Sequence, residues 1–394
     1  MNNQSVATGI LSALLACTGG AILVIHTADL VGLSRPELIS WLFIVYVIGG
    51  CLSIIFTIKY KIPMAGAHSI TAIAFLSTAA ADFTLPELAG SFMMAGGLMA
   101  LLGFSGIFKK VLAHIPKPLI DAMLAGLILN FVVEIVPAFK ESPLIAGLAI
   151  LGFFVVPKIS KSIPPLLGVL LFGVLGLLLG YDFPKISGEP FSWPHLVTPS
   201  FTAHGFFSIS IPVAVLILSN DLAVALTALK KNGFDPPINQ AIAFSGLGTA
   251  LAGLFGGHSA NIGGMMTALC SSEEAGSKDS RYWAALVSSV VVTLFGLFVW
   301  KVVVLIESLP AFFITLITGF SLIGVLLGSL QSAFTEPTYK YSTLFAFVIA
   351  ISNVSFIGIS SAVWSLLVGG IAAKVLGEGD IGKDNPAKRQ NKAI

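Results

Sequence analysis

The sequence predicts an all-α polytopic membrane protein, and composition and hydropathy pattern are the reasons. Hydrophobic residues make up 56% of the 394 residues and charged residues only 10%, whereas about 25% of a soluble domain is charged. The mean hydropathy is +0.96. The apolar residues are gathered in fourteen runs between charged or Pro/Gly-rich breaks. Such runs are expected to be helices, because a helix in a bilayer satisfies its own backbone hydrogen bonds.

We expect twelve of the runs to cross the membrane in full and two to be half-helices, too short for the about 20 residues that a spanning helix needs. The approximate limits are 9–30, 37–58, 68–80, 87–108, 117–138, 142–157, 163–180, 208–229, 237–255, 260–272, 282–305, 310–332, 340–353 and 356–376. The short runs are the third and tenth segments. The proline-rich connector 181–207 separates seven segments from seven. No Lys or Arg precedes the first run, so we expect a retained span rather than a cleaved signal peptide.

The two halves carry short matches in the same order. At offsets between 190 and 200 the matching stretches are Gly66, His68 and Ser69 with Gly256, His258 and Ser259, Ile115-Pro116 with Leu309-Pro310, and Thr27-Ala28 with Thr227-Ala228. Because seven segments is an odd number, the second half must enter the membrane from the opposite side. The sequence therefore predicts two inverted seven-segment repeats.

The basic residues predict the orientation. With the N-terminus in the cytoplasm, every Lys and Arg lies on the inner side except Arg35, Lys140, Lys185 and Lys301, as the positive-inside rule expects. Both termini are then cytoplasmic, residues 377–394 form a solvated tail, and the location is the inner cell membrane. The net charge of +2 gives no reason to expect a nucleic-acid partner. The sequence leaves a homodimer open.

The two short segments are the main functional signal. A helix that begins at the membrane midplane presents free N–H groups and a positive dipole end, which suit a carboxylate. The candidate substrate-binding residues are polar or glycine positions at these helix ends and in the eighth segment. They are His68, Ser69, Asn220, Gly257, His258, Ser259 and Asn261. For Ser69 and Ser259, helix capping alone is the alternative.

Two residues are candidates for the coupling proton, Asp221 and His258. Asp221 lies nine residues before Lys230, which is roughly 13 Å from the inner edge of the membrane. An acid there needs a partner or a proton. Histidine can change charge near neutral pH. A structural hydrogen bond is the alternative for both. Asp121 and Glu134 are expected near the ends of the fifth segment, where hydration makes an acid inexpensive.

The sequence argues against an enzyme. It has no nucleophile elbow, phosphate-binding Gly-Lys-Ser/Thr loop or HExxH motif, and its histidines lack a clustered metal-ligand spacing. We therefore expect no cofactor, no metal and no ATP-driven transport. An anion channel is an alternative of a different class, but it would need a continuous polar path rather than one polar cluster.

Several short motifs, spread along essentially the whole chain, resemble the benzoate:proton symporter (BenE-type) family. They are Ile62-Pro63-Met64-Ala65-Gly66-Ala67-His68-Ser69, Ile115-Pro116 with Ala122-Met123-Leu124-Ala125-Gly126, Ser219-Asn220-Asp221, Phe255-Gly256-Gly257-His258-Ser259, Cys270-Ser271-Ser272-Glu273 and Ser280-Arg281-Tyr282-Trp283-Ala284-Ala285. The resemblance implies uptake of benzoate, or a similar aromatic or organic carboxylate, together with a proton.

More distantly, Asn261-Ile262-Gly263 is similar to a signature of nucleobase:cation symporters. That kinship implies a core domain, residues 1–115 and 208–305, and a gate domain, residues 116–180 and 306–376. The third and tenth segments would each begin with a short extended stretch, and the substrate would lie between them while the core moves against the gate.

Two departures from the nucleobase carriers favour an anion as the substrate. Those carriers have glutamates at the positions that match Asn220 and Ala260, and both residues are neutral here. Without these carboxylates the site suits a negative group at the helix ends better than a neutral base that donates N–H groups. A nucleobase (uracil- or xanthine-type) proton symporter on the same fold is the alternative.

Overall fold

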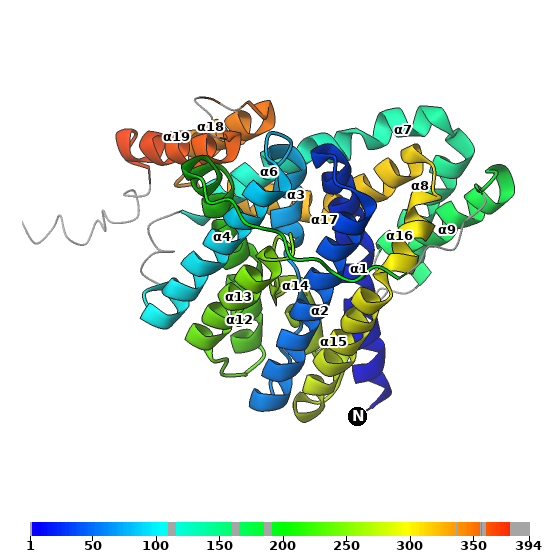
Figure 1. The fold of residues 1–394 in the computed structure, drawn as a ribbon, viewed down its shortest axis with the longest axis horizontal. Helices are drawn as coiled ribbons and strands as arrows, with labels where there is room; N and C mark the ends of the chain where they lie inside the picture. The colour runs from blue at the N-terminus through cyan, green and yellow to red at the C-terminus, as the bar shows by residue number, and fades with distance from the viewer. Residues whose placement is uncertain are drawn as a thin grey trace, which may run out of the picture.

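The computed structural model describes residues 2–108, 116–159, 165–184, 191–335, 337–354, 356 and 360–378. Nearly all of their regular structure is helical (Figure 1). The first part of the chain forms α1 (Asn3–Val31), α2 (Arg35–Tyr60), β1 (Gly66–Ala67), α3 (Ile70–Ala79), α4 (Leu85–Ser105), α6 (Lys117–Val133), α7 (Ile135–Glu141), α8 (Pro143–Ile159) and α9 (Pro165–Gly180).

The second part begins after the connector. It forms α10 (Ala203–Gly205), η1 (Phe206–Ser210), α11 (Ile211–Leu216), η2 (Ile217–Leu222), α12 (Ala223–Lys231), α13 (Ile238–Gly253), β2 (Asn261–Ile262), α14 (Gly264–Ser271), η3 (Glu273–Ala275), η4 (Lys278–Ser280), α15 (Arg281–Leu297), α16 (Val299–Glu307), α17 (Ala311–Thr335), α18 (Lys340–Ser352) and α19 (Ser361–Val375).

Fewer helices reach spanning length than the sequence predicts. Among the described residues seven are long and apolar enough to cross a membrane, against the twelve expected. The difference arises because hydropathy alone does not predict where the backbone conformation ends a helix. For example, α18 has 13 residues and ends at Asn353, whose φ of 50° is left-handed. The eleventh segment is interrupted at Phe298, between α15 and α16.

The eighth segment differs from the plain helix that the sequence predicts. Helical structure is continuous from Ala203 to Lys231, but η1 and η2 are π-helical turns. In a π turn the backbone bonds to the fifth residue along instead of the fourth, and such turns are frequent at functional sites. The η2 turn contains Asn220 and Asp221.

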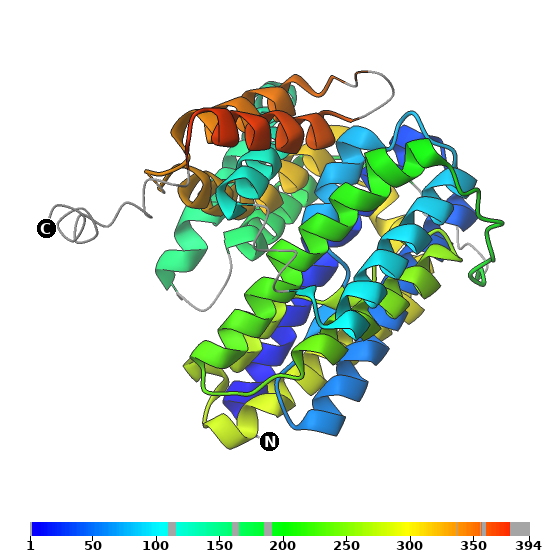
Figure 2. The same cartoon turned by 90° about the vertical axis from the view of Figure 1, so that its left-hand side faces the viewer.

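The helices pack in two groups, which lie against each other in Figure 2. In the first group α4 packs on α13, α15 packs on α1 and α2, and α14 packs on α12. In the second group α6 packs on α17 and α18, α18 packs on α19, and α8 packs on α9. Contacts of α1 with α17 and of α3 with α6 join the two groups. The joint between the groups is where a cavity is found.

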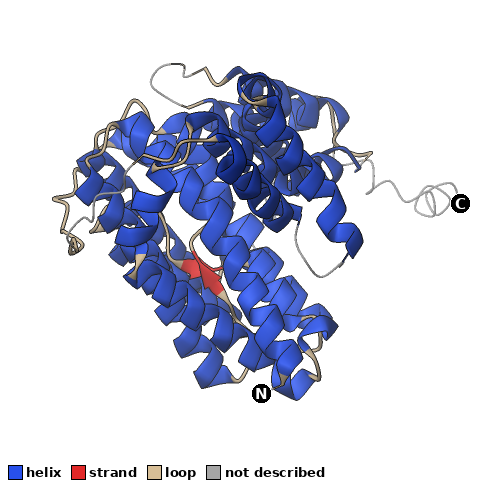
Figure 3. Cartoon of the chain, turned by 90° about the vertical axis from the view of Figure 1, so that its right-hand side faces the viewer, coloured by secondary structure: helices blue, strands red, loops and turns tan. Residues whose placement is uncertain are grey.

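Two strands, β1 and β2, of two residues each, lie side by side among the helices (Figure 3). They pair antiparallel, with Gly66 opposite Ile262 and Ala67 opposite Asn261. A Cβ at Gly66 would lie 2.2 Å from the carbonyl oxygen of Asn261, so only glycine permits this approach. The short helices α3 and α14 follow the strands after a few residues.

One end of the molecule gathers the N-terminus and several basic loops (Figure 1). The Ser5 hydroxyl donates to the carbonyl of Ala275 over 2.8 Å. The Lys278 ammonium donates to the carbonyl of Gly233 over 2.6 Å, and Lys61 lies 5.1 Å from the Tyr282 ring centroid. This clustering agrees with the charge pattern, although the side of the membrane stays a prediction. Several residues used in the sequence argument lie outside the described residues: Lys109, Lys110, Ile115, Lys161, Lys185 and the tail beyond 378.

Candidate functional site

A cavity of about 400 Å³ lies between the two groups of helices. The first group contributes residues of α1, the start of α3, η2, α12 and the start of α14. The second group contributes residues of α6 and α17. The polar or charged lining residues are His68, Thr71, Lys117, Asp121, Asn220, Asp221, Ser329 and Ser332. The remaining wall is aliphatic, glycine and methionine, so the cavity has an apolar body with a few polar groups, as small-molecule sites usually do.

The N-terminus of α14 opens into this cavity. Its N-cap is Gly263, which has no side chain to satisfy the first N–H groups of the helix. Gly263, Gly264, Met265 and Met266 all line the cavity. A Cβ at Gly264 would lie 2.7 Å from the carbonyl oxygen of Asn220, so the absence of a side chain lets α14 approach η2. The arrangement presents backbone N–H donors and a positive dipole end at the cavity, with the Gly264 N–H directed at Asp221.

The N-terminus of α3 is capped by the protein itself. The Ser69 hydroxyl accepts from the N–H of Ala72 over 3.1 Å, so Ser69 is a serine N-cap. The N–H of Ser69 in turn donates to the Ser259 hydroxyl over 2.8 Å. Ser259 thereby connects the segment before α14 to the start of α3.

Asp221 and Asn220 bring unpartnered polar atoms to the site. Asp221 is only 8% exposed, and its Oδ2 has no hydrogen-bond partner among the described residues. The same holds for the side-chain nitrogen of Asn220 and the side-chain oxygen of Asn261. The Ser69 hydroxyl, the Gly264 N–H and the Asn261 amide surround the Asp221 carboxyl. Since buried polar atoms are rarely left without a partner, this cluster indicates a binding site for a ligand or a proton.

The two histidines form part of a directed chain of hydrogen bonds. The Trp41 indole donates to Nδ1 of His258 over 2.9 Å. Nε2 of His258 lies 3.2 Å from both Nδ1 of His68 and the carbonyl oxygen of Ser69. Nε2 of His68 lies 3.0 Å from the Tyr46 hydroxyl, which donates to the carbonyl of Ala16 over 2.9 Å.

The chain of hydrogen bonds fixes the protonation of both rings. An indole N–H can only donate, so Nδ1 of His258 must accept and its proton must be on Nε2. Nδ1 of His68 then accepts, and the proton of His68 is on Nε2, directed at Tyr46. A second proton on either ring would place two donors face to face. In this arrangement His68 and His258 are therefore neutral.

The predicted substrate-binding residues separate into two layers. His68 and Asn220 line the cavity, as does the proton candidate Asp221. Ser69 lies beside the Asp221 carboxyl. Behind them, outside the cavity lining, are Gly257, His258, Ser259 and Asn261.

Sequence reasoning missed the contribution of the second group of helices. Asp121 was expected near a hydrated end of its segment, and this is wrong: it is 3% exposed and lines the cavity. Lys117 and Ser332 also line the cavity and contact Asp121. Glu134 is exposed, as expected. An acid four residues after Lys117 was visible in the sequence, but which helix faced the cavity was not.

Replacing Trp41 by Phe is expected to destabilise the folded protein by about 1–3 kcal/mol, because Nδ1 of His258 loses its donor inside the protein. The unfolding midpoint in detergent measures this. Trp193→Phe is a matched control, because Trp193 is 73% exposed. Equal midpoints for the two variants would contradict a contribution of the Trp41–His258 hydrogen bond to stability.

Comparisons with known proteins bear on the whole chain. A family model described as "Benzoate membrane transport protein" matches residues 1–375. The chain is 26% identical over 377 residues to "Inner membrane protein YdcO" of Escherichia coli (strain K12), covering 94% of this chain and 95% of that protein. It is 24% identical over 378 residues to "Benzoate membrane transport protein" of Acinetobacter baylyi, with 95% of each chain covered.

Solved transporter structures share the fold. The transmembrane domain of a cyanobacterial bicarbonate transporter, BicA, matches with a TM-score of 0.57 and 16% identity, covering 95% of this chain and 98% of that one. SLC26A9 matches with a TM-score of 0.64 and 14% identity, covering 94% of this chain and 65% of that one. At this level of identity the likeness concerns the fold alone.

Proposed function

Because the chain belongs to the benzoate membrane transport protein (BenE) family and is thus a membrane transporter rather than an enzyme, we propose that it carries benzoate or a similar aromatic carboxylate together with a proton. The observation that carries the proposal is the Asp221 carboxyl, whose Oδ2 has no partner among the described residues, beside the N-terminus of α14, whose N-cap residue supplies no side-chain cap, in one cavity. It combines a proton carrier with an anion site.

The proposed architecture is fourteen segments in two inverted repeats, with α3 and α14 as half-helices. Residues that are equivalent under a twofold axis contact each other where they lie near the axis. His68 contacts His258, and Ser69 contacts Ser259, with both pairs 190 residues apart. The antiparallel pairing of β1 and β2 supports the same relation. The first group of helices is then the core, the second is the gate, and transport moves one against the other around the site.

The substrate carboxylate is placed at the N-terminus of α14, where the N–H groups of Met265 and Met266 can donate to it. The aromatic ring then lies against the apolar wall, which includes Leu124, Val224, Val325 and the two methionines. Thioether sulfurs make favourable contacts with ring edges. An apolar wall with one anion site suits an aromatic carboxylate better than a small hydrophilic anion.

Asp221 couples the proton to the substrate. Two carboxylates about 4 Å apart repel by about 4 kcal/mol at an effective dielectric constant of about 20. The substrate anion can therefore occupy the α14 terminus only when Asp221 is protonated, and each promotes the binding of the other. His258 is the weaker candidate, because the Trp41 indole occupies the nitrogen that would have to accept the proton.

Uptake into proteoliposomes tests the proposal. Labelled benzoate is expected to accumulate when the outside is more acidic than the inside. Accumulation is expected to stop when an ionophore collapses the gradient. Uptake that ignores the gradient would refute proton coupling. Competition by uracil or xanthine, but not by carboxylates, would instead identify a nucleobase carrier.

Replacing His258 by Gln is expected to preserve proton coupling. A Gln side chain can accept from Trp41 and donate to Ser69, so transport should slow by no more than about tenfold, the equivalent of one hydrogen bond. The number of protons moved per benzoate is the decisive measurement, and it should stay unchanged. Loss of coupling with intact benzoate binding would instead identify His258 as the proton carrier.

A further inference from the structure

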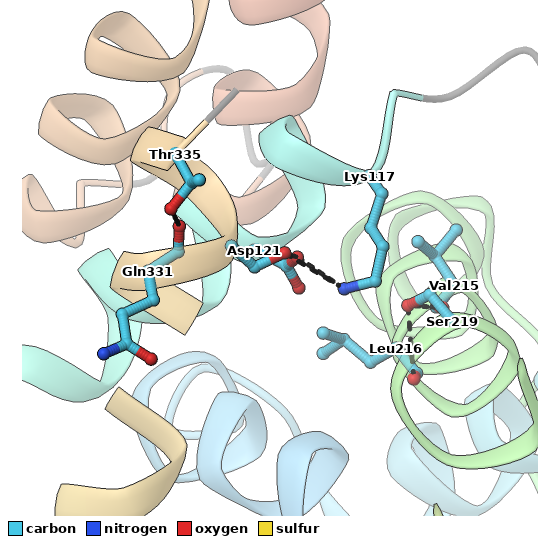
Figure 4. A network of polar contacts seen from close by, with 8 residues as sticks. Lys117, Asp121, Val215, Leu216, Ser219, Gln331 and Thr335 are labelled. Carbon is cyan, nitrogen blue, oxygen red and sulfur yellow. Dashed lines mark hydrogen bonds and ion pairs between the residues drawn. The ribbon is translucent and has the colours of Figure 1, made fainter. Parts of the chain in front are cut away.

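The gate side of the cavity carries an ion pair that connects two helices. The Lys117 ammonium lies 2.5 Å from Oδ2 of Asp121, one turn further along α6. The Ser332 hydroxyl of α17 contacts the same oxygen, and the Lys117 ammonium lies 3.4 Å from that hydroxyl. Figure 4 shows the Lys117 side chain extended toward the Asp121 carboxylate, beside α17. All three residues line the cavity.

Helix stability does not account for this pair. Lys117 is the first residue of α6, where the helix dipole favours an anion rather than a cation. A lysine four residues before an aspartate is also the less favourable order for an ion pair within a helix. The Asp121 side chain is 4% exposed and that of Lys117 is 55% exposed, so a buried acid holds an accessible cation at the cavity.

Among the side chains that line the cavity, the charges leave Lys117 as the one that can attract an anion. Asp121 and Asp221 are acids, and the hydrogen-bond chain keeps His68 neutral. Within the described lining, Lys117 is the one side chain with a fixed positive charge. An ammonium has three N–H donors. Asp121 and Ser332 engage two of them, which leaves one for a ligand.

We propose that Lys117 is a substrate-binding residue, the counter-ion that receives the carboxylate of the substrate at the gate side of the cavity. Asp121 and Ser332 are positioning residues that hold the half-exposed ammonium at the cavity. The substrate anion then lies between two positive groups, Lys117 on the gate and the α14 terminus on the core. The inference rests on the proposed carboxylate substrate and adds the residue that recognises its charge from the gate.

Benzoate binding to the purified full-length protein, measured by calorimetry in detergent, tests the inference. Lys117→Gln is expected to weaken binding about ten- to hundredfold, the usual effect of losing a charge-assisted hydrogen bond. Lys117→Arg should restore most of the affinity, because it returns the charge. Lys140→Gln, at an exposed position of α7, is the matched control and should bind like the wild type.

The outcomes separate this inference from the proposed function. If wild type binds benzoate and Lys117→Gln binds it equally well, the Lys117 assignment is overturned while the function stands. If both Lys117 variants lose affinity and the empty protein also melts at a lower temperature, the pair is structural and the assignment is overturned. If wild type binds no carboxylate, the proposed function itself fails. Weak binding by Lys117→Gln, with recovery in Lys117→Arg and an unchanged melting temperature, supports the proposal.

Discussion

Asp221→Asn is expected to abolish proton-driven accumulation of benzoate while leaving benzoate binding intact. Asparagine has nearly the shape of protonated aspartic acid but cannot release a proton. The α14 terminus therefore stays available to the substrate anion at every pH. In the wild type, affinity should fall by about tenfold per pH unit once Asp221 is ionised, because binding then requires the uptake of one proton. In the variant, affinity should not depend on pH through this range.

Calorimetry across pH and uptake into proteoliposomes measure the two halves of this prediction. Asp235→Asn removes an acid from an exposed loop and should leave both measurements unchanged. Facilitated exchange of labelled for unlabelled benzoate should survive in Asp221→Asn, since exchange needs no net proton movement. If Asp221→Asn still concentrates benzoate like the wild type, Asp221 is not the residue that couples the proton to transport.

Gly264→Ala is expected to weaken benzoate binding about ten- to hundredfold, because the charge-assisted hydrogen bonds from the start of α14 to the carboxylate are weakened or lost. The added Cβ would lie 2.7 Å from the carbonyl oxygen of Asn220 and 3.0 Å from that of Asp221. Backbone atoms cannot rotate away, so the start of α14 must move from η2. The N–H donors then no longer point at the position of the carboxylate.

Gly97→Ala is the matched control, because no atom lies within 4 Å of a Cβ built there. Both variants replace a helical glycine by the same residue, so a difference in affinity between them reports the local geometry of α14. Unfolding midpoints, measured in parallel, separate a displaced site from a misfolded protein. Benzoate affinity in Gly264→Ala equal to that in Gly97→Ala would refute the placement of the substrate.

Sequence reasoning singled out residues that the first group of helices brings to the cavity and missed those of the second group. Asp221 stood out because an acid in the middle of an apolar run has few explanations other than function. Asp121 did not stand out. It lies only four residues after Lys117, near the end of its segment, and this closeness predicted a hydrated position. Its burial results from α17 packing on α6, a contact between residues about 200 positions apart. Hydropathy contains no information about such a contact.

The histidines illustrate a different limit. Their equal surroundings in the two halves were visible in the sequence, and they do lie together, 3.2 Å apart. Their chemical state depends on Trp41 and Tyr46, which the sequence gives no reason to single out. An imidazole that can accept a second proton in isolation does not accept one when a fixed donor points at its second nitrogen.

The sequence by itself determined that this chain is a helical membrane transporter of the BenE family, because composition, apolar runs and short motifs are properties of the chain. It also determined which polar residues interrupt those runs. The tertiary structure alone decided which of them line one cavity and which form hydrogen bonds with each other. It also decided that a lysine and an aspartate of α6 complete the wall of that cavity. The physical reason is that accessibility and hydrogen-bond partners depend on contacts between distant segments, and these contacts exist only after the two groups of helices have packed.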